Sequence, residues 1–434
     1  MRKNKLIFTQ DYNPVEEDHS VEERQKEESM NLFNDYGLSK LINAVGPSTF
    51  VGTSRVSKEV ISYMESVLTE AVDMRQLQEL ANEVIRKYTG AEAGCVTGCS
   101  AAGVAVGVAA FLTRDDLGKI TSLPKPVQGP HHIVIQKAQM ISGGGCSIEL
   151  LLRLSGAEIT EVGEAADCGL FQLDGALDES VAGAVFVMGS RAITPGTIPL
   201  KTFTGICHEH KVPVLVDAAG EVNIQQFIDQ GADLVVASSH KWLGGPTAGL
   251  IAGRSDLVHA CFLNGEFGIG RPMKVGKEGI AGLIGALETF TTRNGAEQKT
   301  RGEAIVKHLY SLLNDEPGIQ LKIINPPVNS IHSCGLRIFV DPGFAGLAAW
   351  ELSERLLKGN PRIALDAYDA SEGYVTVNPG LLDFGDDEII ASRIKEVTAD
   401  ARKSGTEPQE YIPRFETLVS HLRDWRDEYP VLKN

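Results

Sequence analysis

The chain has 434 residues, of which 43% are hydrophobic and 23% are charged, and its formal net charge is −16. This length predicts two domains, and the composition is ordinary for a globular protein. The negative charge argues against broad binding to a nucleic-acid backbone, and no apolar run reaches the length of a membrane span. The basic start at Met1 lacks the apolar core of a signal peptide, so we expect a cytoplasmic protein with no nucleic-acid and no membrane partner.

Residues 1–36 are polar and acidic, and we interpret them as an acidic N-terminal arm. Ordered structure is expected to begin at Leu41. Apolar residues at helical spacing then predict helices, and short apolar runs predict strands. The expected helices are Ser57–Leu68, a segment between Asp73 and Gly90, an Ala/Val-rich segment ending near Leu112, and Ile148–Leu154. The expected strands are His132–Gln136, Glu158–Val162, Ala184–Met188, Val212–Asp217, Leu234–Ala237 and Gly249–Ala252.

This alternation of strands and helices indicates a mainly parallel sheet with right-handed crossovers. We assign it to a large domain over residues 37–290, whose first segment can join the smaller domain. A long helical region is expected from Lys277 to about Leu313. Residues 291–434 predict a small α+β domain and tail. Its expected elements are strands Leu336–Val340 and Tyr374–Val377 and helices Asp386–Ala401 and Phe415–Asp424.

The seven cysteines are spread thinly along the chain. Cys95 and Cys99 are four residues apart, but no second pair of ligands follows at zinc spacing. Buried free thiols explain this pattern better, so no metal site is expected.

Two opposite charges close neighbouring apolar runs, at Asp217 and Lys241. Ligands of open α/β sheets bind at the carboxyl ends of the strands. Pyridoxal phosphate needs both groups, because a lysine amine binds its aldehyde and a carboxylate keeps its ring nitrogen protonated. Taken singly, Lys241 is more simply interpreted as a solvent-facing lysine, and Asp217 can equally cap the helix that follows it. Ala219 is small enough to lie beneath a ring.

A third signal is the run of small residues from Thr97 to Gly103, which predicts a strand, a turn and a helix. Backbone N–H groups at a helix start hold phosphate, and the helix dipole favours the anion. Cys99, Ser100 and Ala101 are the expected contacts, and Ser238 can add a hydroxyl group. Such turns are common, but phosphate cradle, acid and lysine follow one another in an order that suits one cofactor.

These segments resemble the fold-type I pyridoxal-phosphate enzymes, and within them the family related to selenocysteine synthase (seryl-tRNA selenium transferase). The resemblance covers about residues 38–400. The segments that carry it are Leu41–Gly46, Val72–Gln78, Tyr88–Gly103, Ser155–Gly163, Val216–Glu221, Ser238–Gly249 and Gly270–Glu278. It implies an α/β fold with a mainly parallel seven-stranded sheet, pyridoxal phosphate as cofactor, and a homodimer or higher homo-oligomer that shares residues between subunits.

The stretch from Arg271 to Glu278 resembles most the D-glucosaminate-6-phosphate ammonia-lyase branch of this family. That branch removes water and ammonia from an amino sugar acid. The resemblance therefore implies a lyase that acts on a small anionic amino acid or amino sugar acid. A selenium transferase has a dedicated N-terminal domain for tRNA, whereas the arm here is short and acidic and would repel a polyanion.

Within this hypothesis Lys241 takes the α-proton, and Lys241 or His240 protonates the leaving group. His240 can instead be a packed neighbour that orients the loop. Arg271 and Lys274, with Lys277, form a basic cluster for an anionic substrate, or an ordinary solvated loop.

Other assignments rest on less. Arg337 and Arg362 are candidates for binding the α-carboxylate, and Gln139 for covering the second face of the ring. A racemase, an aldolase, a β-lyase, a tRNA-dependent selenium transferase or a non-catalytic relative remains an alternative.

Overall fold

The computed structural model describes residues 31–143, 146–189, 191–290, 295–325, 334–405, 407–412 and 423. The chain divides into two compact units, one of which covers Leu41–Tyr411. The other contains residues 1–40 and the C-terminal segment from Ile412, and its described part includes the short helix α1 (Leu32–Asp35). Among the described residues, no helix combines the length and the apolarity that a membrane crossing requires.

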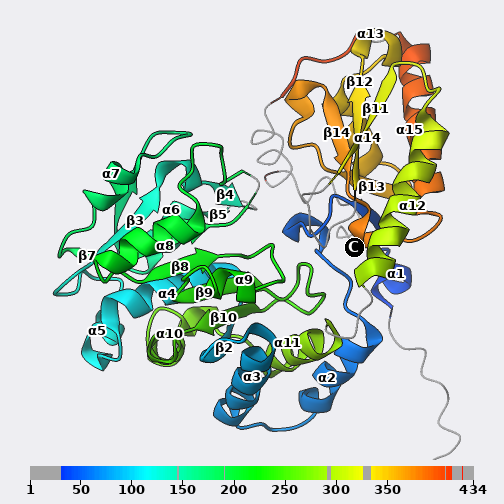
Figure 1. Cartoon of the computed structure of the whole chain (residues 1–434). Helices are drawn as coiled ribbons and strands as arrows, with labels where there is room; N and C mark the ends of the chain where they lie inside the picture. The colour runs from blue at the N-terminus through cyan, green and yellow to red at the C-terminus, as the bar shows by residue number, and fades with distance from the viewer. Residues whose placement is uncertain are drawn as a thin grey trace, which may run out of the picture. The chain divides into compact units, whose positions relative to one another are not determined.

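A seven-stranded sheet forms the centre of the unit Leu41–Tyr411 (Figure 1). Its order is β2-β10-β9-β8-β7-β3-β6, and every neighbouring pair is parallel except those that β10 makes. The strands are β2 (Ala93–Thr97), β3 (His132–Gln136), β6 (Glu158–Val162), β7 (Val181–Val187), β8 (Val214–Asp217), β9 (Leu234–Ser238) and β10 (Gly249–Gly253). The predicted mainly parallel seven-stranded sheet is therefore confirmed.

Successive residues of these strands enter two different hydrophobic cores. In β8, Val214 and Val216 belong to one core and Leu215 to the other. Both faces are covered by helices, which is why the strands read as continuous apolar runs. The first core uses α3 (Met74–Thr89), α8 (Leu200–Glu209) and α11 (Lys277–Phe290), and the second uses α4 (Ser100–Thr113), α6 (Ile148–Leu154) and α10 (Ser255–Phe267).

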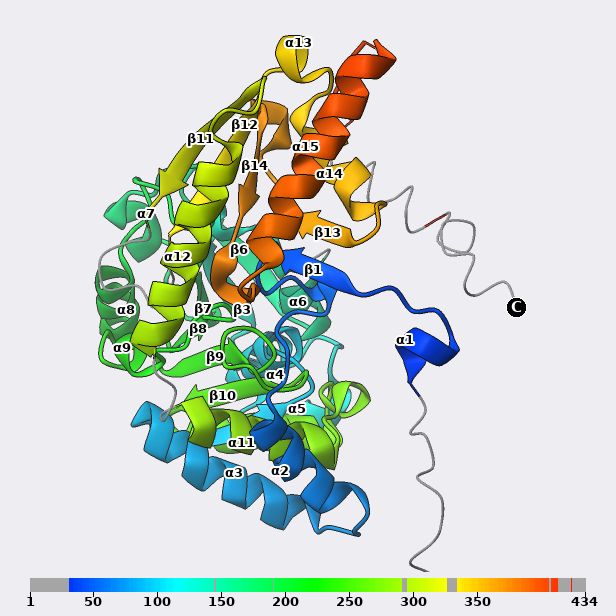
Figure 2. The ribbon, with the colours of Figure 1, turned by 90° about the vertical axis from the view of Figure 1, so that its right-hand side faces the viewer.

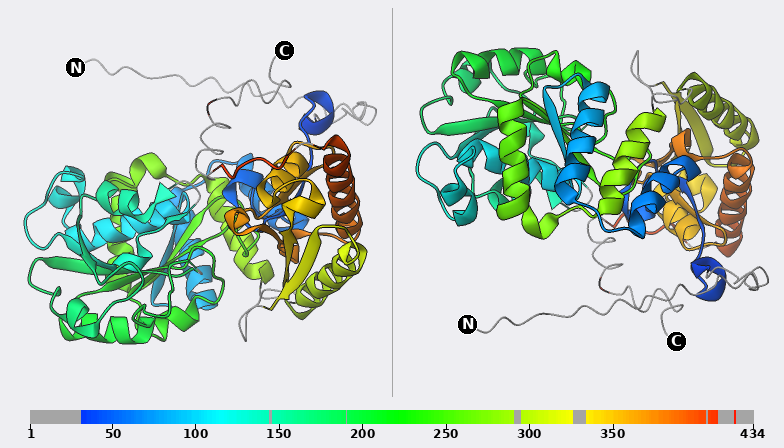
Figure 3. Two further views of the ribbon diagram at one scale, coloured as in Figure 1. Left: turned by 90° about the horizontal axis from the view of Figure 1, so that it is seen from above. Right: turned by 90° about the horizontal axis from the view of Figure 1, so that it is seen from below.

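The remaining elements around this sheet are short. α2 packs along α11, as Figure 3 shows. The elements are α2 (Lys58–Leu68), α5 (Leu117–Ser122), α7 (Leu170–Asp174), α9 (Gln225–Ile228), η2 (Thr49–Val51), η3 (Lys137–Gln139), η4 (Arg271–Met273), β4 (Ser142–Gly143) and β5 (Cys146–Ser147).

A smaller α+β arrangement follows in the chain. Its antiparallel sheet has the order β11-β12-β14, and β1 pairs with β13, so the first strand of the chain joins the last part of the fold. α12 and α15 pack together beside these strands (Figure 2). The elements are β1 (Leu41–Ala44), α12 (Gly295–Leu313), β11 (Ile319–Ile324), β12 (Gly335–Val340), α13 (Pro342–Ala345), α14 (Ala349–Leu357), β13 (Arg362–Leu365), η5 (Ala370–Glu372), β14 (Tyr374–Val377), η6 (Pro379–Leu381) and α15 (Asp386–Ser404).

Element bounds differ from the predictions by a few residues. The long helical region predicted after Lys277 contains two helices, α11 and α12, separated by residues 291–294, which lie outside the described part. The helix predicted at Phe415–Asp424 also falls outside the described residues, apart from Arg423. The domain boundaries at residues 36 and 290 stay a prediction.

Candidate active site

Asp217 is the last residue of β8, at the carboxyl end of the strand. Its Oδ1 accepts a hydrogen bond of 3.1 Å from the N–H of Ala219. Burial raises the pKa of the Asp217 carboxyl, while the Ala219 N–H and the Lys241 charge act in the opposite direction. A cationic group beside this carboxyl would therefore stabilise its ionised form, which burial disfavours.

Lys241 lies three residues beyond the end of β9, the strand that pairs with β8. Burial lowers the pKa of the Lys241 amine, and the Asp217 carboxylate opposes this shift. The structure therefore brings the two predicted residues close enough to act on each other's charge. Neighbouring parallel strands that end at the same edge account for this arrangement.

His240 is buried beside Lys241, and its Nδ1 lies 3.3 Å from the Oγ of Ser238. Burial, and then the Lys241 charge, lowers the pKa of the His240 imidazole. The His240 carbonyl accepts hydrogen bonds from the backbone N–H (3.2 Å) and the Oγ (2.7 Å) of Ser54. A segment far away in the sequence thus fixes the lysine loop.

The turn before α4 also has the predicted form. Cys99 is the N-cap, and its Sγ accepts a hydrogen bond of 3.4 Å from the N–H of Ala102. The first backbone hydrogen bond of the helix runs from Gly103 to Cys99, so the N–H groups of Ser100 and Ala101 precede it. These two groups are at the positive end of a helix dipole, where an anion is stabilised.

Two glycines allow this turn to be tightly surrounded. A Cβ at Gly98 would lie 2.4 Å from the Met273 carbonyl oxygen, and a Cβ at Gly249 would lie 2.3 Å from the Cys99 carbonyl oxygen. Neither position can hold a side chain without displacing backbone. The η4 segment therefore packs directly against the turn.

That packing brings the predicted basic residues near the turn. Arg271 and Lys274 are exposed, and the Nη1 of Arg271 lies 3.9 Å from Glu266. Lys277 does not join them, because its Nζ donates hydrogen bonds to the carbonyls of Leu68 and Glu70. The predicted cluster is therefore a pair of cations rather than three.

A cavity of about 200 Å³ lies behind the turn, between α3, α4, α10 and η4. Thr97, Arg271 and Lys274 contribute to its wall. Asp217 and Lys241 do not line it. We therefore do not identify this cavity with the centre that holds the two charged residues.

Three other predicted residues are engaged elsewhere. Gln139 is fully buried, and its amide exchanges hydrogen bonds with the backbone of Val187, which gives no support to a ring-covering role. The Nε of Arg362 donates to the Leu357 carbonyl, and the Arg337 guanidinium stacks over a tyrosine ring. These two arginine contacts lie at the end of α14 and on the ring of Tyr374.

Sequence reasoning missed two residues near this centre. Ser54 carries no local signal, because its partner His240 is 186 residues away. Glu221 is four residues beyond Asp217, and burial raises the pKa of its carboxyl group. Only the packing could identify either one.

The model of the family described as SelA: L-seryl-tRNA selenium transferase matches residues 58–315, more than half of the chain. The chain belongs to this family. Among similar proteins, a 5'-C-glycyluridine monooxygenase-decarboxylase from Streptomyces sp is 34% identical over 85% of this chain and 92% of its own length. A D-glucosaminate-6-phosphate ammonia lyase from Salmonella typhimurium is 30% identical over 86% of this chain and 99% of its own length.

A solved structure of D-glucosaminate-6-phosphate ammonia-lyase aligns with 86% of this SelA-family chain and 100% of its own, with a TM-score of 0.76 and 27% identity. The predicted family and the predicted fold-type I architecture are confirmed. The roles assigned to individual site residues stay predictions.

Proposed function

We propose that this chain is a pyridoxal-phosphate-dependent lyase that removes ammonia and water from a small anionic amino acid or amino sugar acid. The observation that carries the proposal is the half-buried pair of Asp217 and Lys241, one at the end of β8 and the other three residues beyond the end of the neighbouring strand β9. The relationship to an ammonia lyase over nearly its whole length supports the same reaction class.

The residues fit the cofactor. Lys241 would bind the aldehyde, Asp217 the ring nitrogen, and the N–H groups of Ser100 and Ala101 the phosphate, with the Ser238 hydroxyl as a further donor. The close packing at Gly98 and Gly249 leaves the turn rigid enough to hold an anion. Bound pyridoxal phosphate would supply a ring that withdraws electrons from the substrate α-carbon.

The chain's own groups would move the protons. Because burial lowers the pKa of Lys241, a larger fraction of its amine is unprotonated near neutral pH and can take a proton from the α-carbon. The lowered pKa of His240 makes its protonated ring a stronger acid, so an imidazolium that has taken up a proton can pass it to a departing hydroxyl group. The Ser54 contacts orient this loop without touching the reacting atoms.

Arg271 and Lys274 support an anionic substrate, because they stand out in a chain of net charge −16. The Salmonella relative is named for a phosphorylated amino sugar acid, and such a substrate suits these cations. We further propose a homodimer or higher homo-oligomer as the working form. The acidic residues 1–36 continue to argue against a tRNA substrate.

A second candidate is an oxygen-dependent decarboxylase. It is favoured by the Streptomyces relative, whose name describes a monooxygenase-decarboxylase and whose identity of 34% exceeds that of the ammonia lyase. The two reactions differ in the gases that they consume and release. Oxidative decarboxylation consumes oxygen and releases carbon dioxide, whereas elimination does neither.

The deciding experiment incubates cofactor-loaded protein with D-glucosaminate 6-phosphate and related amino acids, with and without oxygen. Equal amounts of ammonia and 2-keto acid, formed anaerobically and abolished by Lys241→Ala, are expected. Oxygen-dependent release of carbon dioxide would support the second candidate instead. A strict requirement for an amino acceptor would refute elimination.

A further inference from the structure

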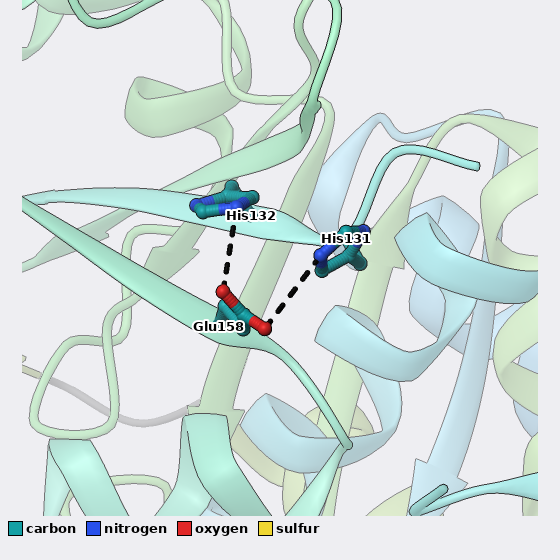
Figure 4. A group of neighbouring side chains, drawn as sticks. All are labelled: His131, His132 and Glu158. Carbon is teal, nitrogen blue, oxygen red and sulfur yellow. Dashed lines mark ion pairs between the residues drawn. The ribbon is translucent and has the colours of Figure 1, made fainter. Parts of the chain in front are cut away.

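Two adjacent histidines and a glutamate meet at the edge of the central sheet that is opposite to the candidate active site. His131 immediately precedes β3, His132 begins it, and Glu158 begins the neighbouring edge strand β6 (Figure 4). One ligand atom from each of the three side chains lies within 4.8 Å of the others. Asp217 ends a strand that runs parallel to β3, whose five residues span about 13 Å. The trio is therefore separate from the proposed catalytic chemistry.

The ring proton of His131 is directed away from the glutamate. The Nδ1 of His131 lies 2.8 Å from the Gly129 carbonyl oxygen, which can only accept a hydrogen bond, so this nitrogen carries a proton. The Nδ1 of His132 lies 3.0 Å from the Oγ1 of Thr160. The Thr160 hydroxyl can accept a proton from this nitrogen, and in a neutral ring whose Nδ1 carries the proton, Nε2 presents a lone pair.

Both Nε2 atoms face the carboxylate of Glu158, at 3.8 Å from His131 and 3.5 Å from His132 (Figure 4). These separations are longer than ordinary hydrogen bonds of about 2.9 Å. They are close to the spacing of about 3.4 Å between neighbouring ligands of a tetrahedral zinc ion with bonds near 2.1 Å. Three lone-pair donors that face one another are stabilised by a cation between them.

The backbone holds the three residues in place. The N–H groups of His131 and His132 donate to the same carbonyl, that of Ser180, at 2.9 and 3.0 Å. The N–H of Glu158 donates to the His131 carbonyl at 3.0 Å, and His132 pairs with Glu158 in the β3–β6 register. The donors are thus supplied by paired backbone rather than by a loose loop.

We infer that His131, His132 and Glu158 form a binding site for a divalent transition-metal ion of the Zn²⁺, Co²⁺ or Ni²⁺ class, with an open position for water. Two imidazole nitrogens and one carboxylate suit these ions. The hydrogen bonds from Nδ1 to a carbonyl and to a hydroxyl group are the supporting contacts that metal-binding histidines make. The ion would join the edge strand β6 to β3. This site corrects the expectation, drawn from the cysteine spacing, that the chain holds no metal; the sequence shows no motif here, because the ligands come from two segments joined only by strand pairing.

The test uses the full, untagged, cofactor-loaded chain and zinc chloride, with uptake measured by equilibrium dialysis and by calorimetry. Wild-type protein should bind one zinc ion per chain that His131→Ala and Glu158→Gln bind at least tenfold more weakly. Thr160→Val, which removes only the supporting hydroxyl group, should weaken binding about tenfold. Zinc should also raise the unfolding temperature of the wild type and not that of His131→Ala.

The matched control is His210→Ala. Its imidazole has a similar exposure, 34% against 32% for His131, and likewise lies beside a carboxylate, that of Asp174. This variant should bind zinc as the wild type does. The inference is overturned if the wild type takes up no zinc at micromolar concentrations, if His131→Ala and Glu158→Gln bind it unchanged, or if His210→Ala loses it equally.

Discussion

Gly98→Ala is expected to damage the candidate active site by displacing one backbone segment. The new Cβ would lie 2.4 Å from the Met273 carbonyl oxygen, whereas ordinary contacts begin at 3.4 Å. The turn and the η4 segment must therefore separate by about 1 Å in a closely packed interior. Overpacking of this kind costs about 1–3 kcal/mol of stability, and a misplacement of about 1 Å in a site can lower the rate about 100-fold.

The assay compares ammonia release, cofactor affinity and the free energy of unfolding of Gly98→Ala with those of a matched control. Gly205→Ala is suitable, because Gly205 is in α8 and nothing lies within 4 Å of a Cβ built there. Alanine in this helix should be neutral or slightly stabilising. If Gly98→Ala keeps the turnover and cofactor affinity of Gly205→Ala, the turn is not a close-fitting phosphate cradle and the reasoning fails.

Three further outcomes are expected. Asp217→Asn should lower ammonia release about 100-fold or more while the fold persists by circular dichroism, since an amide does not hold a ring nitrogen protonated as a carboxylate does; unchanged turnover would exclude that role. Ser54→Ala removes the 2.7 Å bond to the His240 carbonyl and should cost about 1 kcal/mol in denaturant unfolding, with a smaller loss of turnover than Asp217→Asn. The lowered pKa of His240 means that the unfolded chain binds this proton more readily, so stability should fall as the pH drops through 6.5; His240→Gln should show a weaker fall over that range in a melting series, and identical slopes would contradict the shift.

The sequence predicts the site features that follow from residues close together in the chain. Asp217 and Lys241 follow continuous apolar runs, which are typical of strands in a sheet covered on both faces. Parallel strands place the residues at their carboxyl ends along one edge of the sheet. The turn from Cys99 to Ala101 also has a local signature, namely a run of small residues at the start of a helix. Each of these features depends on neighbours in the chain, which a pattern can report.

Features that depend on distant packing could not be read in this way. Lys277 resembled a third substrate cation, but its amine binds the carbonyls at the end of α2. Gln139 was expected near a ring, yet its amide completes the hydrogen bonding of a strand end at Val187. Ser54 joins the lysine loop across 186 residues. Polar side chains are satisfied by whichever backbone groups the fold leaves open, and the sequence does not show which.

The central claim is that Lys241 is the residue that binds pyridoxal phosphate. The most direct measurement loads the protein with the cofactor, reduces it with borohydride and locates the pyridoxyl group by peptide mass spectrometry. The account predicts one pyridoxyl group per chain, attached to Lys241 and absent from Lys241→Ala. A group on another lysine, or none at all, would contradict it.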